Sequence, residues 1–152
     1  MTLTPTSYTS RLWQVAFTEL PHPVGLPARH DVVRTGMGLG LPALEAMRER
    51  KEAVGPILCC PAQQVVIVPV AAGTADVWAA PHSLSRSGAQ WHCAEPGCPP
   101  CSGRLWISGG AAITDAAALH HSLSLTRSRL RSGSVRPRGV HREQLSSEVT
   151  HV

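Results

Sequence analysis

The sequence predicts an α+β domain in which a small mixed or antiparallel sheet carries helices on one face. Two short runs rich in β-branched residues, 57–60 and 65–70, are separated by four residues, which is typical of a β-hairpin. Stretches with the helical spacing of apolar residues lie before and after this hairpin. A chain of 152 residues is long enough to bury one hydrophobic core.

Residues 1–29 are expected to form an extended, partly ordered segment that precedes the domain. A short helix is predicted over residues 10–20. Pro21, Pro23 and Pro27 follow it, and each proline fixes its own φ and biases the preceding residue away from helix. The folded domain is therefore expected to begin near residue 30.

The domain is expected to span residues 30–131 and to start with a short strand over residues 31–34. Glycines at 36, 38 and 40 predict a flexible turn. Pro42 opens a helix that runs to residue 51 or 52, since proline fits the first turn of a helix.

The later elements follow from β-branched runs, turn residues and helix caps. The first of them are strands at 57–60 and 65–70 around a turn at 61–64, and a short helix from Thr74 to Trp78. Residues 81–103 are expected to be irregular, with a candidate strand at 91–93. A strand at 104–107 and a helix with N-cap Thr114, Asp115 in its first turn and an end near Arg131 complete the domain.

The excess positive charge lies in the last third of the chain. Residues 1–103 contain seven basic and seven acidic side chains, whereas residues 104–152 contain seven arginines and three carboxylates, which gives the net charge of +4. Residues 132–152 are rich in Arg, Ser, Pro and Gly and predict a disordered basic tail. A basic end of this kind often contacts nucleic acid.

Six arginines at this end are the candidate nucleic-acid-binding residues, because arginines that replace the counterions of phosphates gain free energy from ion release. Helical residues two apart point in different directions, so their contacts would go to the phosphate backbone and read little sequence. The alternative is a solvated tail without a partner. The candidates are Arg127, Arg129, Arg131, Arg136, Arg138 and Arg142.

The segment His-Cys-x4-Cys-x2-Cys is the candidate metal site, formed by His92, Cys93, Cys98 and Cys101. Zinc prefers a tetrahedron of thiolates and imidazoles, and a C-x2-C turn presents two sulfurs to one ion. His82, Cys59 or Cys60 are other candidates for the fourth ligand. Because a second C-x2-C pair is missing, unligated loop cysteines are the competing interpretation.

The expected location is the cytoplasm, and no membrane contact is expected. The N-terminus lacks the long apolar region of a secretory signal, so a reducing compartment is the default for the five cysteines. The longest apolar run, residues 65–72, is far shorter than the ~20 residues of a membrane span. The chain contains no complete catalytic motif, so we expect that it is not an enzyme.

A series of spaced hydrophobic, Gly and Pro positions runs through the predicted domain. The positions are Asp31-Val32-Val33-Arg34, Leu44-Glu45-Ala46-Met47, Gly55-Pro56-Ile57, Pro61, residues 65–68, Ala72-Gly73-Thr74-Ala75, Trp78, Gly103-Arg104-Leu105-Trp106 and Thr114-Asp115. In these positions residues 30–131 resemble small actinobacterial proteins that are similar to the N-terminal domain of bifunctional DNA primase/polymerases. The resemblance implies a primase-like α+β fold, a cytoplasmic location, and a replication or mobile-element context.

The same resemblance implies that most catalytic residues are missing. That family binds two metal ions with a strand Asp-x-Asp, of which Asp31 matches the first aspartate while Val33 stands at the second. The family's histidine position falls on Val66. A two-metal phosphoryl transfer needs carboxylates that bridge both ions, so one aspartate implies a non-catalytic relative.

These observations together predict a non-catalytic, DNA-associated accessory or regulatory protein that acts in replication or its control on a plasmid or integrative mobile element. One alternative is a protein-interaction module, built on a structural zinc knuckle at residues 93–101, that binds a protein partner. A further alternative is a nucleotide-binding remnant that uses Asp31 and the glycines at 36–40, although these lack the G-x-G-x-x-G spacing.

Overall fold

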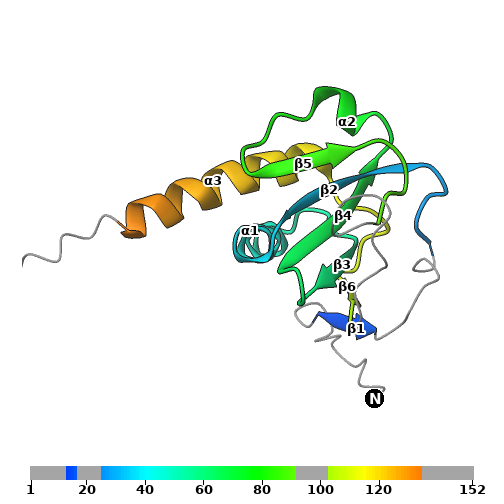
Figure 1. The fold of residues 1–152 in the computed structure, drawn as a ribbon, viewed down its shortest axis with the longest axis horizontal. Coiled ribbons are helices and arrows are strands. Elements are labelled where there is room, and N and C mark those ends of the chain that lie inside the picture. Colours follow the sequence, from blue (N-terminus) through cyan, green and yellow to red (C-terminus); the bar gives the residue numbers. More distant parts are fainter. Residues whose placement is uncertain (1–12, 17–24, 92–102, 135–152) are drawn as a thin grey trace, which may run out of the picture.

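The structure, a computed structural model, describes residues 13–16, 25–91 and 103–134. Strands and helices are mixed along these residues, which confirms the predicted α+β class (Figure 1). In chain order the elements are β1 (Gln14–Ala16), β2 (His30–Gly36), α1 (Met37–Glu49), β3 (Pro56–Cys60), β4 (Val65–Ala71), α2 (Thr74–Val77), β5 (Ser83–Arg86), β6 (Leu105–Ser108) and α3 (Ala116–Ser134).

The six strands form one antiparallel sheet in the order β1-β6-β3-β4-β2-β5. The hairpin predicted from the two β-branched runs is β3 and β4, which pair from Leu58↔Ile67 to Cys60↔Val65. The longest pairing joins β2 to β4 over seven residue pairs, from His30↔Ala71 to Gly36↔Val65. The central strands therefore fix the position of the junction between β2 and α1.

Helices α1 and α3 pack against each other on one face of this sheet, as the sequence predicts. The alternation of side chains along each strand divides the core into two clusters. The helix-side cluster contains Val33, Ile57, Val66, Val68, Val70, Leu44, Met47, Leu119 and Leu123. The opposite face carries Val32, Leu58, Cys60, Ile67 and Trp106, with Trp91 packed against them. Burial of each aliphatic side chain contributes about 1.5–3 kcal/mol to the stability of the fold, so the two clusters stabilise the packing on both faces of the sheet.

The glycines after β2 do not form the predicted flexible turn. Helix α1 begins at Met37, five residues before Pro42, and includes Gly38 and Gly40. Gly40 is buried against β4 and β2, because a Cβ there would lie 2.5 Å from Val66 Cγ2 and 2.7 Å from Thr35 Cγ2. The missing side chain lets α1 approach the sheet closely, so this glycine serves packing.

Three other expectations differ from the structure. Residues 14–16, predicted as part of a helix, form the edge strand β1. The stretch predicted to be irregular after residue 81 contains β5, whose serines alternate with Leu84 and Arg86. Trp91, a candidate strand residue, lies outside the strands.

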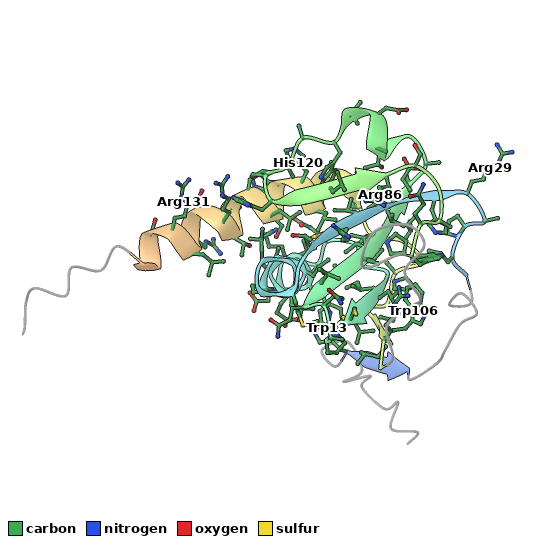
Figure 2. All side chains as sticks on the ribbon, in the orientation of Figure 1. Trp13, Arg29, Arg86, Trp106, His120 and Arg131 are labelled. Atoms are coloured by element: carbon green, nitrogen blue, oxygen red, sulfur yellow. The ribbon has the colours of Figure 1, made fainter. Side chains whose placement is uncertain are left out.

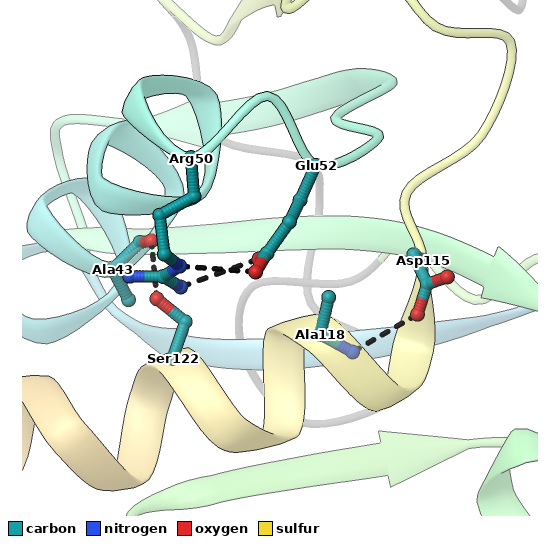
Figure 3. A network of polar contacts seen from close by, with 6 residues as sticks. All are labelled: Ala43, Arg50, Glu52, Asp115, Ala118 and Ser122. Carbon is teal, nitrogen blue, oxygen red and sulfur yellow. Dashed lines mark hydrogen bonds and ion pairs between the residues drawn. The ribbon is translucent and has the colours of Figure 1, made fainter.

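The last helix is longer than predicted and has a different cap. The carboxylate of Asp115 accepts a hydrogen bond from the Ala118 amide at 2.9 Å and caps α3 (Figure 3). Thr114, the predicted cap, instead accepts a hydrogen bond from the Gly55 amide at 3.0 Å. Helix α3 ends at Ser134, three residues beyond the predicted end, and residues 135–152 of the predicted tail lie outside the described residues.

The edge strand β1 is anchored to α1 by the residue that precedes it. Trp13 Nε1 donates a hydrogen bond to Glu45 Oε2 at 2.8 Å, and the Arg48 guanidinium lies 4.1 Å from the centre of the indole ring. The strand itself pairs with β6 from Gln14↔Ser108 to Ala16↔Trp106. No helix in the described parts of the chain is long and apolar enough to cross a membrane.

Candidate nucleic-acid interface

Helix α3 is fixed to the domain along its first half only. Ser122 Oγ, which is fully buried, donates a hydrogen bond to the Ala43 carbonyl of α1 at 2.6 Å (Figure 3). Leu119 and Leu123 belong to the helix-side core cluster. Among the described residues, Thr126 is the last buried one in α3, so the fixed half of the helix ends there.

Residues 127–134 of α3, which we call the arm, project beyond the sheet (Figure 1). Arg127 is partly buried at its base, and residues 128–133 are all exposed. The arm carries Arg127, Arg129 and Arg131, and α3 contains neither Asp nor Glu. Half of the predicted nucleic-acid-binding arginines therefore share one projecting cationic helix segment (Figure 2).

A shallow hollow of about 400 Å³ lies between the base of the arm and the junction of β2 with α1. Its residues come from three parts of the chain: Gly36, Leu39, His82, Arg127, Leu130 and Arg131. No carboxylate from the described part of the chain lines it. A Cβ at Gly36 would meet no atom within 4 Å, so this wall is open space. The hollow thus brings two arginines and a histidine together in one open depression of the surface.

The arm presents arginines on two opposite sides. With 3.6 residues per turn, residues four apart lie on the same side of a helix and residues two apart lie about 200° apart. Arg127 and Arg131 accordingly both line the hollow, whereas Arg129 does not. Arg129 therefore points in a different direction from Arg127 and Arg131, as expected for residues two apart, whereas Arg127 and Arg131 share one side.

The remaining predicted site residues fall outside the described residues: Arg136, Arg138, Arg142, His92, Cys93, Cys98 and Cys101. Within the described ranges, no group of three or more His, Cys, Asp or Glu side chains is placed to hold a metal ion. Cys59 and Cys60 are buried, form no disulfide in the described structure and are adjacent in β3, so they face opposite sides of the sheet. Burial raises the pKa of the Cys59 thiol to about 11.

Asp31, the carboxylate that the resemblance aligns with a metal ligand, is bound by backbone amides. Its Oδ2 accepts hydrogen bonds from the amides of Gly73 at 3.0 Å and Ala75 at 2.9 Å. Its Oδ1 accepts one from the Gly88 amide at 3.1 Å. The Ala75 amide is the largest of the contributions that lower the pKa of this carboxylate, so the side chain is ionised and fixes the loops around α2 and after β5.

The sequence gives no signal that Gly36, Leu39 and His82 lie beside the arm. Gly36, Leu39 and His82 are far from the arm in the chain, and only the packing of α3 on α1 brings them beside it. Leu130, which also lines the hollow, stands among the arginines of the arm and is 53% exposed.

Comparison of the chain with protein families, with characterised proteins and with solved structures finds no significant match.

Proposed function

We propose that this protein binds DNA through contacts between the arm and the phosphate backbone, as a non-catalytic accessory or regulatory factor in the cytoplasm. The observation that carries the proposal is the arm itself, a projecting helix segment with three arginines and no carboxylate. Cations in such a position replace the counterions of phosphates, and this supplies most of the non-specific affinity for nucleic acid. The role in replication on a plasmid or integrative element rests only on the resemblance of residues 30–131.

The surroundings of the arm support a polyanionic ligand. The hollow at its base adds His82 to Arg127 and Arg131, and none of the described residues that line it is acidic. Two acidic residues in or just after α1 contact other parts of the domain, since Glu45 contacts Trp13 and Arg48 while Glu52 pairs with Arg50.

The test is a salt titration of DNA binding by the full chain, measured by fluorescence anisotropy on a labelled 20-base-pair duplex. The triple variant Arg127→Ala, Arg129→Ala and Arg131→Ala should reduce the slope of log K against log salt by about 2.7, since each phosphate contact contributes about 0.9. Circular dichroism should show both proteins equally folded, because none of the three side chains belongs to the core.

Arg29→Ala is the matched control. Arg29 is an exposed arginine at the end of the molecule opposite the arm (Figure 2), so its removal changes the net charge without touching the proposed interface. It should leave the slope unchanged. An equal slope for the wild type and the triple variant would contradict the proposal.

A further inference from the structure

We propose that the arm lies in the major groove of B-form duplex DNA, with one phosphate strand on each side of it. This inference rests on the proposed function and names its ligand as a double helix. It starts from the shape of the arm, an α-helical segment whose diameter with side chains is about 10–12 Å. The major groove of B-form DNA is about 12 Å wide and admits an α-helix.

The exposure of the arm fits insertion into a groove. Residues 128–133 are exposed on every side of the helix, whereas a helix segment that bound a flat surface would need only one accessible side. Thr126 is the last buried residue among those of α3 that the structure describes, and beyond it the domain approaches the arm on the side of the open hollow. DNA could therefore surround the arm while the fixed half of α3 stays in the core.

The arginines have the arrangement that two phosphate strands require. Arg127 and Arg131 lie about 40° apart on the side of the hollow, and Arg129 lies about 200° from Arg127 on the opposite side. In a major groove the two backbones run along opposite sides of an inserted helix. A single strand would reach one of these sides only, so the opposed arginines favour a duplex.

The hollow provides the position of the strand nearer the domain. Its wall at Gly36 has no side chain and is open, and His82 projects from the turn before β5 to the same hollow. A phosphate there would meet His82, Arg127 and Arg131 with no carboxylate among the lining residues. The far strand would meet Arg129.

The side of the arm between the two arginine sides would face the base edges. It carries Ser128 and Ser132, about 100° and 140° from Arg127, and both are exposed. The Ser132 hydroxyl donates to the Ser128 carbonyl at 3.0 Å and keeps its lone pairs for a donor on a base. Serine hydroxyls can contact several bases, so we expect little sequence preference.

The experiment compares three probes of the same 20-nucleotide sequence with the full chain: duplex DNA, duplex RNA and single-stranded DNA. The major groove of A-form RNA is deep and narrow and does not admit side chains in this way. Duplex DNA should therefore bind at least roughly tenfold more tightly than either other probe. Arg129→Ala and Arg131→Ala should each weaken duplex binding by roughly tenfold at 0.1 M salt, and Arg29→Ala should not.

A second pair of variants tests whether the DNA strand nearer the domain lies in the hollow. Gly36→Leu places a side chain at the wall of the hollow, whereas Gly38→Leu places the same side chain at an equally open position that does not line it. Only Gly36→Leu should weaken duplex binding. An equal effect of the two variants would remove the hollow from the contact and overturn this placement.

The outcomes separate this inference from the proposed function. Equal or tighter binding of single-stranded DNA or duplex RNA would overturn the groove placement while leaving DNA binding in place. An effect of Arg131→Ala without any effect of Arg129→Ala would do the same, because only one side of the arm would then contact the ligand. Absence of binding to all three probes would overturn both proposals.

Discussion

Replacement of Asp31 by asparagine should destabilise the domain strongly, because this one carboxylate holds three backbone amides from two different loops. The amides of Gly73 and Ala75 bind one oxygen and the Gly88 amide binds the other, all between 2.9 and 3.1 Å. The side chain is 5% exposed, so water cannot easily replace it. These contacts link β2 to α2 and to the segment after β5.

The magnitude follows from the hydrogen bonds. A bond to an ionised group contributes about 1.5–3 kcal/mol, and an unsatisfied buried donor costs about 1–3 kcal/mol. Asparagine keeps one acceptor oxygen but turns an amide NH2 towards a backbone N–H and removes the charge. We expect a loss of about 2–4 kcal/mol in the free energy of unfolding at pH 7, a large part of the 5–15 kcal/mol that domains usually have.

Urea denaturation at several pH values provides the assay. Because the pKa of Asp31 is lowered in the folded state, its contribution is complete above the unfolded pKa of about 3.9 and is lost as the pH falls through the folded value. The difference between wild type and Asp31→Asn should therefore be constant above about pH 5 and shrink below pH 4.

The control is Asp76→Asn, which neutralises an exposed carboxylate on α2 close to the same loops. It should change the unfolding free energy by less than about 0.5 kcal/mol. A loss below about 1 kcal/mol for Asp31→Asn, or a difference as large at pH 3 as at pH 7, would refute the reasoning.

Three further predictions concern α1, α3 and β3. Gly40→Ala should lower the free energy of unfolding by about 1–3 kcal/mol, because its Cβ would lie 2.5 Å from Val66 Cγ2. Gly38→Ala, at a position in open space, should raise the free energy of unfolding by about 0.5 kcal/mol. Thermal unfolding that ranks the two variants the other way would be inconsistent with this packing. Asp115→Ala should cost about 1 kcal/mol in urea denaturation through loss of the cap on the Ala118 amide, and no loss would mean that the cap is not used. With a thiol pKa of about 11, Cys59 should resist maleimide at pH 8 in the folded protein and react with it in urea. Peptide mass spectrometry measures the modification, and equal rates in the folded and the urea-unfolded protein would argue against burial of Cys59.

The sequence predicts those parts of the fold in which pattern and packing agree. The run of β-branched residues at 65–70 is apolar at every position because both faces of β4 are covered, by α1 on one side and by the cluster around Trp106 on the other. The predicted start of α1 at Pro42 is wrong, because glycines such as Gly38 and Gly40 usually mark turns. The close approach of Gly40 to Val66 explains why a glycine lies inside this helix. β5 was missed because a Ser-Leu-Ser-Arg edge strand has little hydrophobic signal.

The candidate interface divides in the same way. The arginines of the arm could be predicted, because their excess charge is visible in the sequence. The hollow could not, since it depends on how α3 crosses α1 and brings His82 and Gly36 to Arg127. A long-range contact such as that of Ser122 with Ala43 has no counterpart in local periodicity.

The three residues of β1 cover the edge of β6 and satisfy its hydrogen-bonding groups. They occupy the outer side of β6, and the indole of Trp13 fastens them to α1. Deletion of residues 1–16 would leave the amides and carbonyls of β6 as a bare template for a strand of another molecule. Such a truncated chain should assemble into thioflavin-positive fibrils. The shortest of the described strands would then reduce the tendency of the protein to aggregate.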